Sequence, residues 1–168
     1  MMQLSLSIDS SLLVRDVAGD YRPANADEVL QAARRVLAGQ MRGCEALTSP
    51  QVVRDFLRVK LGALEHEVFA VIHLDAQNRV IDYIEMFRGT VSQTSVYPRE
   101  VVKEALAKNS AALLLVHNHP SGVAEPSRAD ELLTQTLKSA LALVDVRVLD
   151  HLIVAGNDVM SFAERGLL

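Results

Sequence analysis

The segment that most constrains the fold is AALLLVHNH, residues 111–119, in which an unbroken apolar run ends in two histidines. Its short length and continuous apolar character predict a buried β-strand. The next residues, PSG, predict a turn that takes the chain away from the sheet. This strand is therefore expected to deliver polar side chains to the rim of an otherwise apolar sheet.

Strand and helix patterns alternate around this run. The predicted elements are strands over residues 68–75, 79–87, 146–154 and 157–162, and helices over residues 97–109 and 127–144. The first two strands are separated only by AQN, which is typical of a hairpin turn. Alternating strands and helices with a leading hairpin predict an α/β fold, in which a mixed β-sheet is sandwiched by helices.

The N-terminal part of the chain is expected to be mainly helical. The first predicted helix, residues 25–40, begins at the N-cap Asn25 and is expected to end at Gly39. The second predicted helix covers residues 49–62 and has Pro50 at its first position.

The hydrophobic period changes near residue 62. This change divides the chain into an N-terminal helical extension, residues 1–62, and a second region, residues 63–168. Near the start of the chain, Leu4, Leu6 and Ile8 alternate as in an edge strand, unless this segment is mobile.

Composition restricts the partners and the compartment. The chain has 168 residues and a formal net charge of −4, so no overall basic field attracts it to nucleic acid or to an acidic membrane. Its single cysteine, Cys44, excludes an internal disulfide and a cysteine-rich zinc site. The start of the chain lacks the pattern of a signal peptide, and no apolar run approaches the roughly 18 residues of a membrane span. We expect a cytoplasmic protein.

Two histidines and an aspartate have the spacing of a metal site. On a strand, His117 and His119 lie on the same face, so both imidazoles can reach one ion. Ser127 is the expected N-cap of the next helix, which puts Asp130 at its third position, pointing back toward the histidines. Three protein ligands leave one position of a zinc tetrahedron open, as in catalytic zinc sites.

Each of these residues also has a structural interpretation. Ser127 and Asp130 suit a helix N-terminus without any catalytic role, because they cap it and complement its dipole. Histidines at a strand end can simply bind neighbouring backbone groups, and for His151 a buried ring bound to a backbone carbonyl is favoured over a partner or ligand of the metal site. Tyr97 and Arg99 either line a groove or act as a cap and a surface charge.

Residues 65–168 resemble the catalytic domain of the bacterial RadC family. The motif H-x-H-P-x6-S-x-x-D also resembles the metal motif of JAMM/MPN+ metalloproteases. The matching stretches are EVFAVIHLDAQNRVIDY, FRGT, YPREVVKEAL, HNHPSG, EPSRAD, VLDHLIV and SFAERGLL. The residue between the histidines, Asn118, departs from the serine or threonine usual in eukaryotic JAMM enzymes but is typical of RadC.

The resemblance implies a cytidine-deaminase-like JAB/MPN fold and a Zn²⁺ site formed by the two histidines and the aspartate of the motif. It also implies that Glu67 acts as general base, with Glu65 and Glu85 as alternatives, and that Ser127 supports the oxyanion. The family often carries a helix-hairpin-helix near its N-terminus, whereas residues 25–62 show only a shorter helical lead-in without a basic stripe.

The implied function is zinc-dependent hydrolysis of a peptide or isopeptide bond in a protein or peptide substrate. A zinc deaminase is excluded, because that chemistry uses H-x-E and P-C-x-x-C motifs, which the sequence lacks. The alternative is a non-catalytic RadC-like binding module, associated with DNA or a DNA-bound partner, although the net charge does not support nucleic acid binding. No membrane partner is expected, and the sequence sets no oligomeric state.

Overall fold

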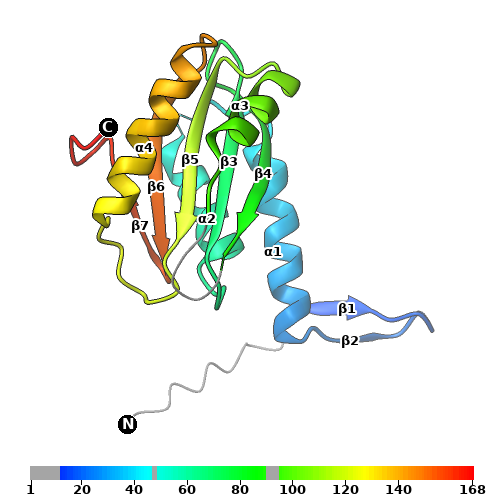
Figure 1. The fold of residues 1–168 in the computed structure, drawn as a ribbon. Helices are drawn as coiled ribbons and strands as arrows, with labels where there is room; N and C mark the ends of the chain where they lie inside the picture. Colours follow the sequence, from blue (N-terminus) through cyan, green and yellow to red (C-terminus); the bar gives the residue numbers. More distant parts are fainter. Residues whose placement is uncertain (1–11, 47–48, 90–94) are drawn as a thin grey trace.

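The computed structural model of the chain describes residues 12–46, 49–89 and 95–168. The helices are α1 (Ala26–Met41), α2 (Pro50–Leu61), α3 (Pro98–Ala107) and α4 (Arg128–Ala142). The strands are β1 (Leu13–Arg15), β2 (Tyr21–Pro23), β3 (Val68–Leu74), β4 (Val80–Arg88), β5 (Ala112–Asn118), β6 (Arg147–Ala155) and β7 (Asp158–Ser161). The main sheet has five strands. Figure 1 shows helices on both of its faces and the β1–β2 hairpin apart from it.

The main sheet has the strand order β4-β3-β5-β6-β7 and is mixed. Among its described strands only β5 and β6 pair in parallel, and the other neighbouring strands are antiparallel. A parallel pair requires a crossover connection, which α4 supplies between β5 and β6. The predicted mixed α/β fold, with a sheet between layers of helices, is confirmed.

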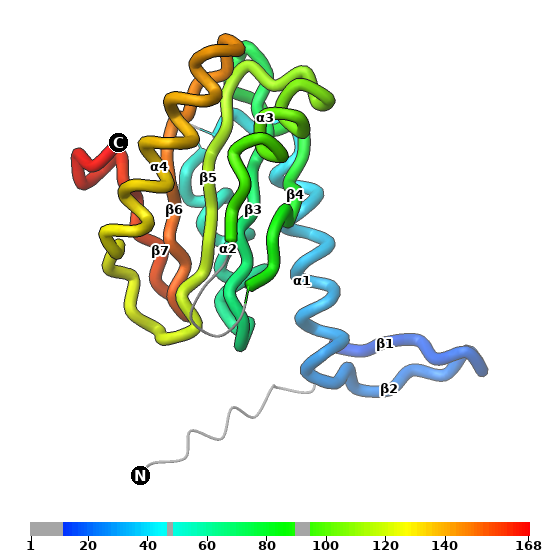
Figure 2. The backbone as a smooth tube through the Cα atoms, in the orientation of Figure 1, coloured from blue at the N-terminus to red at the C-terminus, as the bar shows by residue number. Residues whose placement is uncertain are grey.

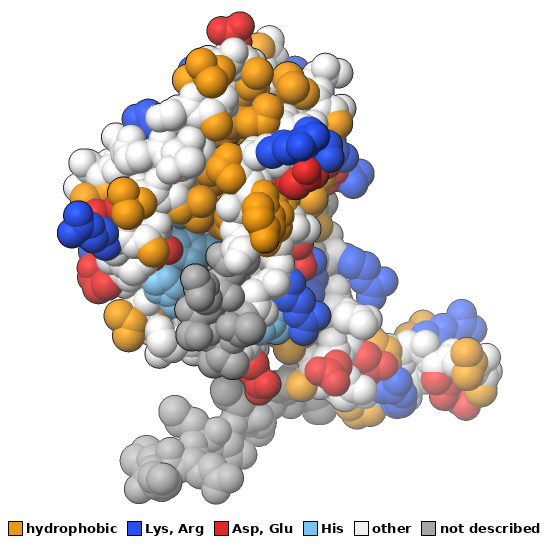
Figure 3. Space-filling view, in the orientation of Figure 1, with side chains coloured by type: hydrophobic (Ala, Val, Ile, Leu, Met, Phe, Trp, Pro, Cys, Tyr) orange, Lys and Arg blue, Asp and Glu red, His pale blue; other side chains and the backbone are white. Residues whose placement is uncertain are grey.

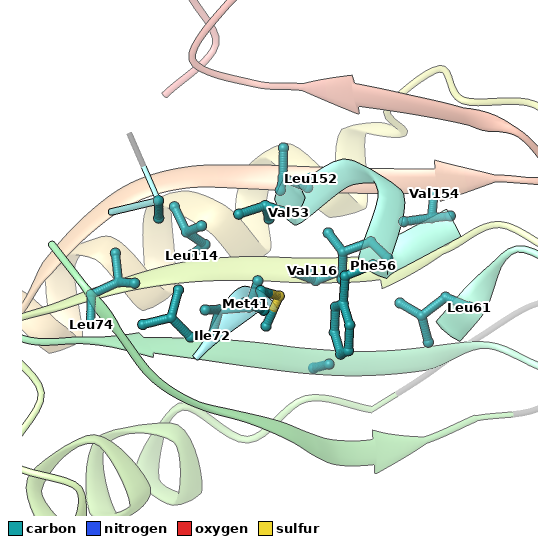
Figure 4. Close-up of a cluster of buried hydrophobic side chains, with 14 of the residues drawn as sticks. Met41, Val53, Phe56, Leu61, Ile72, Leu74, Leu114, Val116, Leu152 and Val154 are labelled. Atoms are coloured by element: carbon teal, nitrogen blue, oxygen red, sulfur yellow. The ribbon is translucent and has the colours of Figure 1, made fainter. Parts of the chain in front are cut away.

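Each face of the sheet has its own apolar core, because the central strands are buried on both sides. On one face, α2 packs against β3, β5 and β6, as Figure 4 shows. This core includes Met41, Val53, Phe56, Leu57, Leu61, Ile72, Leu74, Leu114, Val116, Leu152 and Val154. On the other face, α3 and α4 cover Phe69, Val71, Leu113 and Leu115.

The packing of α2 bears on the division of the chain at residue 62. Side chains of α2 share a core with the strands that follow residue 62, and Met41 at the end of α1 joins the same core. The division into residues 1–62 and 63–168 stays a prediction.

None of the described helices combines the length and hydropathy needed to cross a lipid bilayer.

Two features of the N-terminal part differ from the sequence-based expectation. Helix α1 begins after Asn25 as predicted but does not stop at Gly39; it continues to Met41, which is buried. Burial of Met41 outweighs the roughly 1 kcal/mol that a helical glycine costs relative to alanine. The β1–β2 hairpin was not predicted, and in Figure 2 it lies beside the first turn of α1, apart from the main sheet. The strand predicted around Leu4, Leu6 and Ile8 lies outside the described residues.

Gly62 ends α2 at a close approach between two backbone segments. Its φ of −62° is ordinary, so conformation alone does not require glycine. A Cβ atom at this position would lie 2.4 Å from the carbonyl oxygen of Gly156 and 2.6 Å from that of Arg58. The end of α2 therefore fits against the β6–β7 turn only because residue 62 has no side chain.

We predict that Gly62→Ala destabilises the protein by about 1–3 kcal/mol, because backbone atoms must move to accommodate the methyl group. Gly39→Ala is the matched control, since a Cβ at this helical position meets nothing within 4 Å. The control is expected to stabilise the protein by about 0.5–1 kcal/mol. Urea denaturation measures both changes, and equal stabilities of the two variants would contradict the prediction.

Candidate functional site

The end of β5 brings the two histidines of the motif together. His117 is the last but one residue of β5, and His119 is the first residue after the strand. Their rings extend from the same face, and their Nε2 atoms lie 2.9 Å apart. His117 is buried, whereas His119 is partly exposed, and Figure 3 shows histidine side chains at the surface of the α4 face. The strand therefore presents two imidazoles at one point on the rim of the sheet.

The turn after β5 fixes the orientation of His119. Its Nδ1 lies 2.8 Å from the carbonyl oxygen of Val123, and its backbone N–H donates to the carbonyl of Val154. Gly122 has a φ of +77° and donates its N–H to the carbonyl of His119, which closes the turn. Since a carbonyl only accepts, Nδ1 of His119 is the protonated nitrogen, and in the neutral ring Nε2 keeps its lone pair for the site.

Asp130 reaches the histidines from the first turn of α4. Ser127 and Asp130 form a capping box, as the N-cap prediction implied. The carboxylate oxygens lie 3.2 Å from Nε2 of His117 and 3.5 Å from Nε2 of His119. Burial opposes ionisation of Asp130, yet the two imidazoles beside it and the hydroxyl of Ser127 hold the pKa of this carboxyl well below its usual range. The same carboxylate raises the pKa of His119 above its ordinary value.

Glu67 lies immediately before β3 and faces the same point. One of its carboxyl oxygens is within 4.8 Å of a ring nitrogen of both His117 and His119. Its Oε2 atom is buried and has no hydrogen-bond partner among the described residues. The structure thus holds an unsatisfied acceptor next to the two imidazoles.

Asn118, between the two histidines, fixes the backbone on both sides of Glu67. Its Oδ1 accepts the N–H of Val68 at 2.8 Å, and its Nδ2 donates to the carbonyl of His66 at 3.0 Å. The side chain is buried. Sequence reasoning treated Asn118 only as a departure from the eukaryotic motif and did not find this contact. The H-x-H segment therefore carries both imidazoles and the amide that places Glu67.

The two alternative general bases, Glu65 and Glu85, lie outside the cluster, and Ser127 lies beside it. Glu65 is exposed, and Glu85 is exposed on β4 and pairs with Lys60 at 3.1 Å. Neither belongs to the cluster of Glu67 and the two histidines. Ser127 donates its hydroxyl hydrogen to Asp130 Oδ2 at 2.7 Å. It is therefore next to the site, but its hydroxyl is engaged with Asp130.

Tyr97 precedes α3 at the N-cap position but forms no side-chain cap. Its ring is exposed and lies edge-to-face against Phe87, with a centroid distance of 5.9 Å. Arg99 is exposed on the first turn of α3. The structure places neither residue in the cluster around His117.

The hydrogen-bond partners of His151 differ from the expected backbone carbonyl. The ring is fully buried on β6, with Nε2 2.9 Å from Nδ1 of His117 and Nδ1 2.6 Å from the hydroxyl of Thr134. Burial lowers the pKa of His151 well below its ordinary value, and the neighbouring His117 contributes to this shift. The contact was missed because it depends on the β5–β6 register and on α4. His151 is thus a hydrogen-bonding partner of the site.

The donor set fits a small divalent cation. Two nitrogens at about 2.0–2.1 Å from a tetrahedral zinc lie about 3.3 Å from each other. The distances among the ring nitrogens and the Asp130 carboxylate, 2.9, 3.2 and 3.5 Å, bracket this value. Imidazoles and carboxylates are also the ligands that zinc takes in catalytic sites. His117, His119 and Asp130 could therefore hold one ion, with Glu67 beside it.

Comparison with known proteins identifies the family of the chain. The RadC-like JAB domain matches residues 47–167 of the chain. A UPF0758 protein of Leptothrix cholodnii is 63% identical over 150 residues, which cover 89% of this chain and 68% of the relative. UPF0758 proteins of Methylibium petroleiphilum and Aromatoleum aromaticum are 58% and 61% identical, over 95% and 86% of this chain and 75% and 65% of their own lengths. Their names state no activity. The chain belongs to the RadC family and has its JAB/MPN-type fold.

Proposed function

We propose that the protein is a zinc-dependent hydrolase that cleaves a peptide or isopeptide bond by direct attack of water. The observation that carries the proposal is the convergence of two imidazoles and a carboxylate beside the unsatisfied Oε2 of Glu67. Purely structural roles, as strand-end histidines and a helix cap, would explain the two imidazoles and the Asp130 carboxylate one by one. They give no reason for a Glu67 oxygen that is buried without a protein partner. Membership of the RadC-like JAB family supports the same reaction class.

The residues proposed to hold the ion are His117, His119 and Asp130. A zinc ion bound there would polarise the substrate carbonyl and lower the pKa of a coordinated water toward about 7. The hydrogen bond of His119 to Val123 and the capping box of Asp130 orient these side chains before any ion binds. Such hydrogen bonds keep the ligand atoms aimed at one point.

Glu67 is proposed as the general base. Its free Oε2 is positioned to accept a proton from the attacking water and to return it to the leaving amine. Asn118 holds the backbone on both sides of this residue, so the carboxyl group is fixed relative to the two imidazoles. Positioning of this kind reduces the entropy cost of reaching the reactive geometry.

Ser127 is proposed to support the oxyanion that develops on the substrate carbonyl. Its hydroxyl hydrogen is directed to Asp130 Oδ2 in this structure. The role therefore requires rotation of the hydroxyl from the carboxylate toward the substrate. Because Ser127 is exposed, a bound substrate has access to it.

Metal content tests the proposed ligands. We expect about one zinc per chain in wild-type protein purified without chelators or metal-affinity resin, and loss of this zinc in His119→Ala, because one of three protein ligands is missing. His66→Ala is the matched control and should retain zinc, since its ring lies outside the cluster. Elemental mass spectrometry measures the content. A wild-type protein without metal, even after modest excess zinc, would favour the non-catalytic binding module.

Activity tests the role of Glu67. Zinc-loaded protein is incubated with a proteome-derived peptide library and with isopeptide-linked lysine peptides, and mass spectrometry identifies new termini. We expect Glu67→Gln to slow cleavage by at least about 100-fold, because the proton acceptor is lost. The control Glu65→Gln should cleave like the wild type, since Glu65 is exposed outside the cluster.

Two results would count against this mechanism. Cleavage that survives Glu67→Gln would exclude Glu67 as the general base. Absence of cleavage by the zinc-loaded wild type, together with salt-sensitive binding to DNA, would favour the non-catalytic binding module.

Asn118 offers a separate test of positioning. We expect Asn118→Ala to keep its zinc but to lower kcat by about 10- to 100-fold, because the backbone around Glu67 loses two hydrogen bonds. Zinc content and thermal unfolding distinguish misplacement of Glu67 from general loss of structure. A normal kcat in Asn118→Ala would show that Glu67 is held by other contacts.

A further inference from the structure

We propose that Thr134 and His151 are positioning residues that hold His117 in the tautomer with a free Nε2 lone pair. The inference rests on the proposed function and extends it to two residues outside the ligand set. A chain of three hydrogen bonds links the backbone of Asp130 to the ring of His117, and each link has only one allowed direction.

The first link sets the direction of the chain. The hydroxyl of Thr134 donates to the carbonyl oxygen of Asp130 at 2.6 Å. A hydroxyl has a single hydrogen, so the oxygen of Thr134 can only accept from its second partner. That partner is Nδ1 of His151, at 2.6 Å. His151 must therefore carry a hydrogen on Nδ1.

The second link passes this constraint to the metal site. His151 is fully buried, and burial keeps a histidine ring neutral, with a hydrogen on only one nitrogen. With Nδ1 protonated, Nε2 of His151 is an acceptor, and Nδ1 of His117, 2.9 Å away, has to donate to it. His117 then has no hydrogen on Nε2, the atom that faces His119 and Asp130.

The ring of His151 is held firmly in this orientation. Phe162 stacks on it with a centroid distance of 4.8 Å and an interplanar angle of 24°, and Phe69 meets it edge-on at 6.0 Å. Rotation of the ring would have to displace these buried side chains. The hydrogen-bonding direction is therefore determined by packing as well as by the partners.

Helix α4 carries the first two groups of this hydrogen-bond chain, the Asp130 carbonyl and the Thr134 hydroxyl. Asp130 and Thr134 are four residues apart, so they lie on one face of the helix. The same helix thus supplies a carboxylate for the proposed ion and the hydroxyl that determines the tautomer of His117. Without the hydroxyl, His151 can move its hydrogen to Nε2, which forces His117 to protonate the nitrogen that would bind the ion.

Nuclear magnetic resonance on metal-free protein tests the proposal directly. Long-range ¹H–¹⁵N spectra of ¹⁵N-histidine-labelled protein at pH 8 distinguish protonated from unprotonated ring nitrogens, and His117→Gln assigns the signals. We expect wild type and Thr134→Ser to show His117 protonated at Nδ1 only. Thr134→Val, which has nearly the same shape but no hydroxyl, should shift His117 toward the other tautomer.

Zinc affinity, measured by chelator competition, is the second readout. Thr134→Val should bind zinc about 10- to 100-fold more weakly, as for other groups that orient metal ligands, whereas Thr134→Ser should stay near the wild type. His151→Gln and His151→Leu form an independent pair. Glutamine can donate to Thr134 and accept from His117, so it should preserve the tautomer, whereas leucine should not. Thermal unfolding checks that each variant is folded.

The outcomes separate this proposal from the proposed function. An unchanged His117 tautomer and zinc affinity in folded Thr134→Val would overturn the positioning role, while zinc binding by the wild type would leave the hydrolase proposal in place. If the wild type shows the expected tautomer but binds no zinc, the hydrolase proposal is overturned and the hydrogen-bond chain stands.

Discussion

The constraint on which the rest of the site depends is the convergence of electron-pair donors at the end of β5. Nε2 of His117 and of His119 meet the Asp130 carboxylate within 3.5 Å. Groups of this kind repel one another unless a proton or a metal ion lies between them. The contacts around them, from the Val123 carbonyl to the capping box, keep the donors in place despite this repulsion. The fold therefore maintains a point that favours positive charge.

The topology explains why these groups come from distant parts of the sequence. Parallel pairing of β5 with β6 requires the crossover through α4, and the N-terminus of α4 lies near the end of β5. Asp130 reaches the histidines from that helix end, while β3, antiparallel to β5, brings Glu67 close to the same two rings. The site therefore depends on the sheet, because a change in the register of β3, β5 and β6 would separate the side chains of the two histidines, Asp130 and Glu67.

The features that sequence reasoning predicted are local. The strand alternation of His117 and His119 and the spacing of Ser127 and Asp130 depend only on short-range geometry, so the motif was sufficient to find them. His151 was misassigned, because its contact with His117 depends on strand register and its contact with Thr134 on helix packing. The predicted end of α1 at Gly39 was wrong for a similar reason. Burial of Met41, a tertiary effect, overrides the local tendency of Gly39 to end a helix.

The Oε2 atom of Glu67 bears on the choice between the proposed hydrolase and a non-catalytic binding module. A binding module could use the strand end, the capping box and even a bound ion as structural support. None of these structural roles gives a reason for a carboxyl oxygen that no protein group bonds at this point. A general base needs such an oxygen, because an acceptor already occupied by the protein cannot take a proton from water. Asn118 fixes the backbone on both sides of Glu67 through two hydrogen bonds, which leaves the Oε2 atom without a protein partner.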